Sequence, residues 1–491
     1  MKTDAVIAGG GPVGLMLACE LGLSGVDVVV LERTTARPAD ARAWGLHART
    51  AETLDRRDLL STLLVGERVA WPKMPFAGMW PLLQLHPVNA DHPYLLNVSQ
   101  IQVEEVLEAR ARELGVVIKR GHELTGLAQD ADGVAVEATG PDGTYNLHTG
   151  YLIGCDGGRS TTRKLAGIGF PGTDPTVGGM LCDCTLPTMA TEKRGITRTP
   201  GGTVNINPRP NGVVRIVTTE FGRPHPDRDA PVTIEEFRAA VGRILGRDLE
   251  ITDPSFMTRF GDATRQADRY REGRVLLAGD AAHVHFPYGG LGLNLGLQDA
   301  ANLGWKLAAR IQGRAPDSLL DTYHAERHPV AAEVLEYSRT QLALLDPHRN
   351  VTALRSLFQH LLDIPEANRY LAELVSGAST RYPSTEDADP LTGRFARDLA
   401  LKTADGETTL VTLLRQGKPV LLDLAADPAP LTAAGRWADS VHLLAARCDD
   451  PPSPALLVRP DGYVAWAGTD TDSLTRTLTS WFGEPTTPVQ R

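Results

Sequence analysis

The sequence predicts an α/β protein with a mainly β insertion and a smaller α/β unit at the C-terminal end. The chain opens on a strand–turn–helix–strand pattern, in which apolar runs at Ala5–Ala8 and Val26–Leu31 flank a helical segment, Pro12–Leu23. Between about 171 and 273, Thr, Gly and Pro alternate with apolar residues, as in antiparallel strands. A polar, Pro-containing stretch at 383–390 then predicts a linker.

These patterns divide the 491 residues into three expected domains, in keeping with roughly 150 residues per domain. The expected boundaries are 1–170 with 274–385, 171–273, and 391–491. Two antiparallel strands, Gly133–Ala138 and Tyr145–His148, are expected on either side of a Pro-Asp-Gly turn. In the C-terminal unit, Pro419–Leu424 and Ala455–Ala465 read as strands.

Composition excludes several classes of protein. The net charge of -10 argues against sequence-independent nucleic-acid binding, which needs a basic surface. No run approaches the roughly 18 apolar residues of a membrane span, and no signal peptide is visible, so a cytoplasmic protein is expected. Five cysteines do not describe a disulfide scaffold, and Cys182 and Cys184 have no second pair at zinc spacing, so no metal is predicted.

The first chemical motif is the glycine run Gly9–Gly14, which fits G-x-G-x-x-G at a strand-to-helix turn. Gly9 permits the turn, Gly11 lets the backbone approach a pyrophosphate, and Gly14 lets the helix pack on the sheet. Glu32 ends the second strand, 18 positions after Gly14, where a carboxylate can bind ribose hydroxyls. The pattern predicts a dinucleotide site for FAD or NAD.

Two later segments favour FAD. Tyr151–Gly154 and Arg274–Ala278 are strand patterns that end in Asp156-Gly157 and Gly279-Asp280. Both acids are expected at the carboxyl ends of sheet strands, where a carboxylate can accept hydrogen bonds from a ribityl chain. The glycine-rich stretch 287–294 opens a helix and would aim amides at the negative N1–C2=O edge of reduced flavin.

With these three motifs the sequence resembles the class A flavoprotein aromatic hydroxylases, the family of p-hydroxybenzoate hydroxylase. It is most similar to the branch of polyketide hydroxylases and rifampicin monooxygenases. The resemblance runs from Asp4 to about Glu333 and includes the tail. It implies a Rossmann-type FAD-binding domain (1–170 and 274–385, with 70–99 contributing to the substrate pocket), a β-sheet substrate domain, and a thioredoxin-like C-terminal domain. The tail lacks C-x-x-C, so this last domain is expected to be structural or dimer-forming.

The resemblance also assigns residues. Those expected to bind FAD are Gly9, Gly11, Pro12, Gly14, Glu32, Arg33, Arg42, Gln100, Asp156, Gly157, Asp280, Pro287, Gly290, Gly292, Leu293 and Asn294. The sequence departs from the pattern at Leu291, where this branch usually has Gln; the backbone amides remain, so binding is expected to survive. In the segment Tyr323–Arg327, salt bridges are expected rather than catalysis.

The activity implied by the resemblance is hydroxylation of a polycyclic aromatic compound, of polyketide or antibiotic type, through a C4a-hydroperoxyflavin that forms from NADPH or NADH, FAD and O2. Baeyer–Villiger or ring-cleaving oxygenation, a flavin-dependent quinone reductase and a non-catalytic antibiotic-binding flavoprotein remain as alternatives. A monomer or homodimer is expected.

No obligatory catalytic side chain is nominated, because an activated phenol needs mainly orientation and a dry cavity. His47 is a candidate for contact with substrate or for a hydrogen bond to the flavin loop. Arg215 is a candidate for the pocket, against a surface position. The candidate wall residues are Trp71, Met74, Phe76, Trp80, Tyr94, Phe286 and Pro287.

Overall fold

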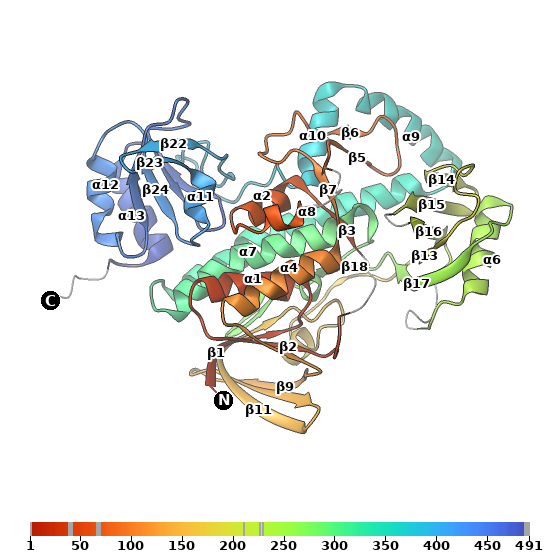
Figure 1. Cartoon of the computed structure of the whole chain (residues 1–491), viewed down its shortest axis with the longest axis horizontal. Coiled ribbons are helices and arrows are strands. Elements are labelled where there is room, and N and C mark those ends of the chain that lie inside the picture. Colours follow the sequence, from red (N-terminus) through yellow and green to blue (C-terminus); the bar gives the residue numbers. More distant parts are fainter. Residues whose placement is uncertain are drawn as a thin grey trace.

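The computed structural model describes residues 2–37, 43–64, 70–209, 212–224, 227 and 230–485 (Figure 1). The predicted N-terminal strands form the centre of a sheet with the order β19-β20-β11-β1-β2-β8, in which β20, β11, β1, β2 and β8 are parallel. Ile7 on β1 lies opposite Val30 on β2 and Ile153 on β11. The bounds are β1 Lys2–Ala8, β2 Val28–Glu32, β8 Val117–Arg120, β11 Gly143–Gly154, β19 Arg271–Glu272 and β20 Val275–Leu277.

Both faces of this sheet are covered, which explains the continuous apolar runs of its strands. Along β1, Ala5 and Ile7 face the helices, whereas Val6 and Ala8 face the antiparallel strands that extend from β11. Gly304 lets two of the helices approach, since a Cβ there would lie 2.3 Å from Cβ of Glu20. The covering elements are α1 Pro12–Leu23, α4 Gln100–Glu113 and α7 Leu291–Ile311 on one face (Figure 1) and β9 Glu123–Gln129 and β10 Val134–Gly140 on the other.

Strand β11 is longer than the sequence pattern indicated. The predicted strands Tyr145–His148 and Tyr151–Gly154 belong to one continuous strand. Its first part pairs antiparallel with β10 and its last part pairs in parallel with β1 and β20. A strand that changes partners along its length has no turn between its two parts, so the hydrophobic pattern alone divided it wrongly.

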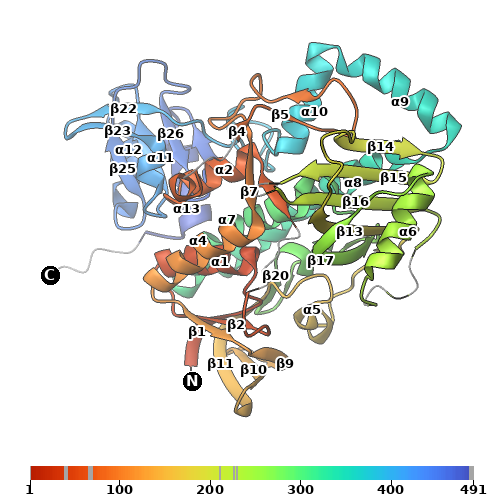
Figure 2. The ribbon, with the colours of Figure 1, turned by 45° about the vertical axis from the view of Figure 1, so that its right-hand side comes forward.

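Within residues 171–273 an antiparallel sheet forms in the order β14-β15-β16-β13-β17 (Figure 2). Alternation gives it two different faces. Cys182, Ile206 and Ile216 pack with helix α6, while Asp183 and Arg215 lie on the opposite face. The bounds are β13 Val177–Thr185, β14 Gly195–Thr199, β15 Gly202–Pro208, β16 Val214–Phe221, β17 Thr252–Gly261 and α6 Ile234–Leu245.

Smaller elements connect these layers. Three short sheets have the orders β12-β18-β21, β3-β7-β4 and β5-β6. The longest helix, α8, contains Pro329. The bounds are β3 Trp44–Leu46, β4 Ala70–Trp71, β5 Lys73–Met74, β6 Leu83–Gln84, β7 Leu95–Ser99, β12 Gly172–Thr173, β18 Thr264–Gln266, β21 His283–Val284, α2 Ala48–Asp55, α3 Leu60–Leu63, α5 Thr161–Leu165, α8 Asp321–Leu345, α9 Arg349–Leu362 and α10 Pro365–Ser376.

The C-terminal part contains a mixed sheet, β25-β24-β26-β27, beside the hairpin β22–β23. The predicted strand Ala455–Ala465 is two antiparallel strands joined by the turn Arg459–Gly462. A charged, Gly-containing turn inside an apolar run is the signal that divides them. The bounds are β22 Ala400–Thr403, β23 Gly406–Thr409, β24 Val420–Asp423, β25 His442–Ala445, β26 Ala455–Val458, β27 Val464–Ala467, α11 Leu410–Leu414, α12 Ala429–Ala434 and α13 Thr471–Phe482. Of the helices in the described ranges, none has the length and apolar character to cross a membrane.

Candidate functional site

The glycine turn after β1 has the geometry that its sequence predicts. Gly9 has a φ of 107°, and a Cβ there would lie 2.3 Å from the carbonyl oxygen of Cys155. A Cβ on Gly14 would lie 2.0 Å from the carbonyl oxygen of Gly9, so helix and turn touch. At Gly11 no atom lies within 4 Å of the added Cβ, and no side chain caps the helix that begins at Pro12. The turn therefore presents open space in front of free helical amides, which suits a phosphate.

Glu32 lies beside this turn at the end of β2. Its Oε2 accepts a hydrogen bond from the backbone N of Gly10 at 2.8 Å, and its Oε1 accepts two from Thr34 at 2.8 and 2.7 Å. The carboxylate is thus fixed next to the open space at Gly11, as expected of a group that binds ribose hydroxyls.

Asp156 follows β11 and contacts the first turn of helix α5, whose N-cap is Ser160. Its carboxylate accepts hydrogen bonds from Oγ of Ser160 (2.5 Å) and from the backbone N and Oγ1 of Thr162 (2.9 and 3.0 Å). Arg163, on the same helix, donates to the carbonyl oxygens of Gly158 (2.9 Å) and Ala281 (2.8 Å). The segments that follow β11 and β20 are therefore tied together.

Asp280 lies in a short 3-10 turn, η2 (Gly279–Ala281), and is exposed. No hydrogen bond to its carboxylate comes from any residue that the structure describes. A Cβ added to Gly292 would lie 3.7 Å from Oδ1 of Asp280 and 3.5 Å from Nε2 of His285. That Nε2 is buried and has no partner in the described ranges, and burial lowers the pKa of His285. A carboxylate and a neutral imidazole thus converge on the start of α7.

The loop before α7 is held from the other side by His47, which lies between β3 and α2. Gly289 and Gly290 have φ values of 78° and 69°, and no side chain caps α7. Oδ1 of Asn294 accepts from the backbone N of His47 at 2.8 Å, and Nε2 of His47 contacts the carbonyl oxygen of Gly289 at 3.0 Å. Leu291 is buried in the core, 3% exposed.

His47 supplies a pH-dependent prediction. Burial lowers the pKa of His47 to about 4, although the carbonyls of Gly289 and Val375 favour the charged form. Because the pKa is depressed on folding, the neutral imidazole stabilises the fold above pH 6.5, and this contribution of about 3 kcal/mol is lost as pH falls toward 4. We expect urea unfolding of His47→Gln to lose correspondingly less stability than the wild type between pH 7 and 4. Equal losses in both proteins would contradict the assignment.

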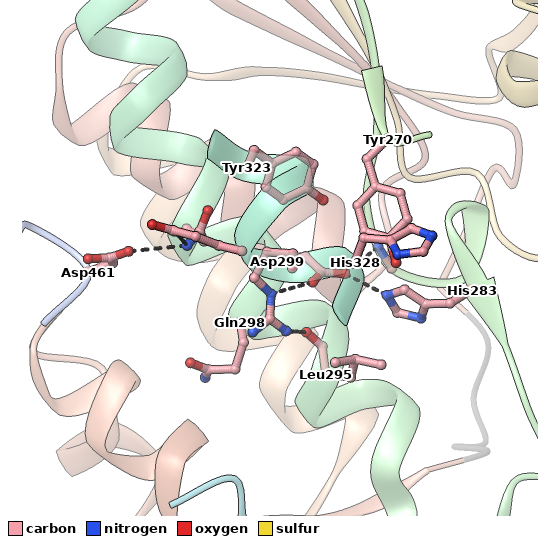
Figure 3. Close-up of polar contacts among 12 residues, drawn as sticks. Tyr270, His283, Leu295, Gln298, Asp299, Tyr323, His328 and Asp461 are labelled. Carbon is pink, nitrogen blue, oxygen red and sulfur yellow. Dashed lines mark hydrogen bonds and ion pairs between the residues drawn. The ribbon is translucent and has the colours of Figure 1, made fainter. Parts of the chain in front are cut away.

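A buried polar network around Asp299 (Figure 3) supports the Gly279–Asp280 turn. Asp299 on α7 is fully buried; its Oδ2 accepts from the backbone N of Gly279 (3.1 Å) and from Nε2 of His283 (2.7 Å), and its Oδ1 accepts from Nε of Arg327 (2.8 Å). Burial raises the pKa of Asp299, but Arg327 and His283 outweigh burial, so the pKa is lowered. The turn is therefore held by an ionised carboxylate.

The network continues into the C-terminal part. Glu326, next to Arg327 on α8, pairs with Arg459 (2.5 and 2.9 Å) and with Lys306 (2.7 Å). Arg459 also pairs with Asp461. The salt bridges expected in the segment Tyr323–Arg327 are present, and they join α8 to the Arg459–Gly462 turn.

The remaining predicted residues do not form one group. Trp71 and Trp80 are exposed (43% and 69%), while Met74 and Phe76 lie in the core, with Phe76 stacked on Phe358. Tyr94 is half-buried beside His92. Phe286 precedes the exposed Pro287 of the loop, and its ring contacts that of Phe260 at 5.7 Å.

Three further cofactor candidates and the pocket candidate Arg215 differ in their surroundings. Arg33 is exposed, and Arg42 lies outside the described residues. Gln100 donates to Glu104 at 2.8 Å. Arg215 is not on the surface, because it is 3% exposed and pairs with Asp183.

Sequence reasoning missed Trp44, Arg209, His285 and the role of Asp299. Each acts through neighbours that are far away along the chain, such as Arg209, whose guanidinium lies 4.6 Å from the ring centre of Trp44. Only the charge of Asp299, within the mainly apolar helical pattern 291–309, could have indicated a buried ion pair.

Comparison with known proteins gives consistent matches. Residues 2–338 match the family model described as "FAD binding domain", and residues 389–485 match "Aromatic-ring hydroxylase, C-terminal". The 12-dehydrotetracycline 5-monooxygenase/anhydrotetracycline 6-monooxygenase of Streptomyces rimosus is 47% identical, covering 99% of this chain and 100% of that protein. A rifampicin monooxygenase of Streptomyces venezuelae is 43% identical, covering 98% and 99%. The solved structure of the anhydrotetracycline hydroxylase OxyS from Streptomyces rimosus has a TM-score of 0.93 at 45% identity, covering 99% of this chain and 100% of that one.

Proposed function

Because this chain belongs to the family of FAD-binding aromatic-ring hydroxylases, we propose that it hydroxylates a polycyclic aromatic substrate of the polyketide or antibiotic type. The co-substrates are O2 and either NADPH or NADH. The observation that carries the proposal is the convergence of three distant segments at the carboxyl ends of β1, β11 and β20. They are the Gly9–Gly14 turn, the Asp156 segment, and the Asp280 turn with the start of α7. Ligands of open α/β sheets bind at such an edge.

The groups present at this edge fit FAD. The free amides beyond Gly11 would bind the pyrophosphate and Glu32 the adenosine ribose, so β1–α1–β2 would act as a Rossmann-type unit. Asp280, with no hydrogen bond from the described residues, would accept hydrogen bonds from the ribityl chain. The uncapped start of α7 would place partial positive charge at the carbonyl edge of the ring system. When bound, FAD supplies the electron transfer from the nicotinamide and the activation of oxygen.

The protein's own contribution is orientation and exclusion of water. The substrate would lie between the loop before α7 and the face of the β13–β17 sheet opposite α6. Two contacts support this position, the rings of Phe260 and Phe286 at 5.7 Å and the guanidinium of Arg209 over Trp44. His47 holds the loop through the carbonyl of Gly289 and has no assigned role in proton transfer.

The domain assignment follows from the same proposal. Residues 1–170 and 274–385 form the FAD-binding domain, to which 70–99 add pocket wall, and 171–273 form the substrate domain. Residues 391–491 form a thioredoxin-like domain whose lone cysteine, Cys448, cannot supply a redox pair. We place the protein in the cytoplasm, as a monomer or homodimer.

The proposal is tested by incubating the holoprotein with NADPH and anhydrotetracycline, the substrate named for two of its relatives, alongside a panel of hydroxylated polycyclic quinones. If the protein is a hydroxylase, one of these compounds should stimulate NADPH oxidation and gain one labelled oxygen atom from O2 on a ring carbon. Label in a new ester would indicate Baeyer–Villiger chemistry instead. Many turnovers without O2 would show a reductase, and binding without NADPH oxidation would show a protein that only sequesters its ligand.

Replacement of the two carboxylates should weaken FAD binding to different degrees. Asp280→Ala removes charge-assisted hydrogen bonds to the ribityl chain, so we expect the dissociation constant for FAD to rise about 100-fold. For Glu32→Ala we expect this constant to rise about tenfold, because only hydrogen bonds to the ribose are lost. Equilibrium dialysis of FAD measures both, with Asp142→Ala in the exposed β10–β11 turn as the control. Undiminished FAD content in Asp280→Ala would refute its assigned contact.

A further inference from the structure

The face of the β13–β17 sheet opposite α6 is polar and lies toward the loop before α7. Strand alternation places Asp183, Asn205 and Arg215 on this face, because their neighbours Cys182, Ile206 and Ile216 pack with α6. Phe260 on β17 shares the face, since a Cβ on its strand partner Gly179 would lie 2.2 Å from its ring. Its contact with Phe286 therefore fixes which way the face points.

Arg209 lies at the edge of this face, just beyond β15. Its guanidinium stacks on the ring of Trp44, and the carbonyl oxygen of Trp44 lies 3.2 Å from the position of a Cβ on Gly290. Trp44 thus connects Arg209 to the loop at which the flavin ring is proposed to lie. The stacked ring also restricts the orientation of the guanidinium.

Among the described residues of this face, the two arginines differ in their acidic partners. Arg215 and Asp183 form a bidentate pair, with distances of 2.7 and 2.5 Å. The guanidinium of Arg209 has no hydrogen-bond acceptor or carboxylate partner within the described ranges, and its Nε is buried. Oδ1 of Asn205 is likewise buried and unpartnered among those residues. Burial and the nearby Arg215 lower the pKa of Arg209 to about 10, although the charge of Asp183 opposes them, so Arg209 still carries its charge at neutral pH.

A half-buried cation beside another cation costs free energy unless an anion joins it. Arg198 on β14 shows the structural alternative, since its guanidinium donates to the carbonyls of Leu345 and Asp346 and to Oγ1 of Thr352. Arg209 has no such acceptors in the described part of the chain. Its environment is that of a group whose partner comes from outside.

We propose that Arg209 binds an oxyanion of the substrate, the phenolate or enolate oxygen of a polycyclic aromatic compound, and that Oδ1 of Asn205 accepts a hydrogen bond from a neighbouring hydroxyl. This inference rests on the proposed function and specifies its substrate as an acidic phenol or an enolised diketone. The planar fork of arginine suits paired oxygens on adjacent positions. An ionised phenol is also the more electron-rich ring, so the same contact would orient the substrate and favour its reaction.

The test compares Arg209→Gln and Arg209→Lys holoproteins with the wild type. The probe is anhydrotetracycline or, if the wild type does not bind it, the phenol from the quinone panel that binds best, together with the O-methyl ether of that probe. We expect Arg209→Gln to bind the phenol about 30-fold more weakly than the wild type does, because one charge-assisted hydrogen bond is lost. Binding of the ether, which carries no oxyanion, should weaken less than about threefold. Arg209→Lys should recover part of the loss. The bound phenol should show the absorbance of its anion in the wild type and not in Arg209→Gln.

Folding and FAD binding provide the controls. Since no carboxylate or hydrogen-bond acceptor among the described residues pairs with the Arg209 guanidinium, Arg209→Gln loses only the stacking on Trp44 and should unfold within a few degrees of the wild type, with unchanged FAD content. Arg243→Gln, which breaks an exposed pair with Glu220 on the α6 side of the sheet, should leave phenol binding unchanged. Unaltered phenol binding and turnover in Arg209→Gln would overturn the inference while the proposed function stood. A wild type that binds none of the phenols, or that oxidises no NADPH with them, would count against both.

Discussion

Gly11→Val is expected to give a folded protein without FAD. No atom lies within 4 Å of a Cβ at Gly11, and its φ of -77° is accessible to any residue, so the substitution should leave the free energy of unfolding of the apoprotein nearly unchanged. The valine would, however, occupy the space through which the backbone approaches the pyrophosphate. We expect the affinity for FAD to fall about 100-fold or more, equivalent to roughly 3 kcal/mol.

The measurement is flavin absorbance after reconstitution, together with the melting temperature of the apoprotein. Gly435→Val is the matched control, because a Cβ there also has open space but lies in the C-terminal part of the chain. Gly14→Ala provides the opposite case: its Cβ would lie 2.0 Å from the carbonyl of Gly9, so the fold itself should be destabilised. A Gly11→Val protein that retains FAD and full activity would contradict the binding of the pyrophosphate at this turn.

Asp299→Ala should have the largest effect on stability. Arg327 is 1% exposed, and without Asp299 its charge would remain buried without its carboxylate, at a cost of about 3–5 kcal/mol. The backbone N of Gly279 would lose its acceptor as well, so the turn that carries Asp280 should also hold FAD less tightly. Because the pKa of Asp299 is lowered on folding, the wild-type contribution is present above the usual aspartate pKa and lost as pH falls through the folded value.

Chemical denaturation of the apoprotein and FAD titration at low denaturant separate the two effects. Asp299→Asn should lose less free energy of unfolding than Asp299→Ala, since it keeps the side-chain volume and an acceptor for the backbone N of Gly279. Asp317→Ala is the control, because its side chain is 53% exposed and its pairs with Arg271 and Arg310 are at the surface, where about 1 kcal/mol per pair or less is expected. A change in Asp299→Ala no larger than that of Asp317→Ala would show that the buried network is dispensable.

The sequence by itself determined the parallel strands around β1, the glycine turn, the position of Glu32 and the family, because each depends on residues close together in the chain. Apolar runs, a turn glycine and a strand-end carboxylate carry their meaning within about 30 residues. The same local logic placed Asp280 and the start of α7, and it identified the segment Tyr323–Arg327 as a source of salt bridges.

Only the tertiary structure decided which distant groups meet. Arg209 contacts Trp44, which lies more than 160 positions earlier in the sequence. Asp299 accepts a hydrogen bond from Gly279, and Arg327 neutralises the charge of Asp299. It also showed that Arg215 is a buried partner of Asp183, and that Met74 and Phe76 belong to the core while Trp71 and Trp80 are exposed. The physical reason is that burial, and with it the strength of a charge or a hydrogen bond, depends on the packing of elements that no local pattern specifies.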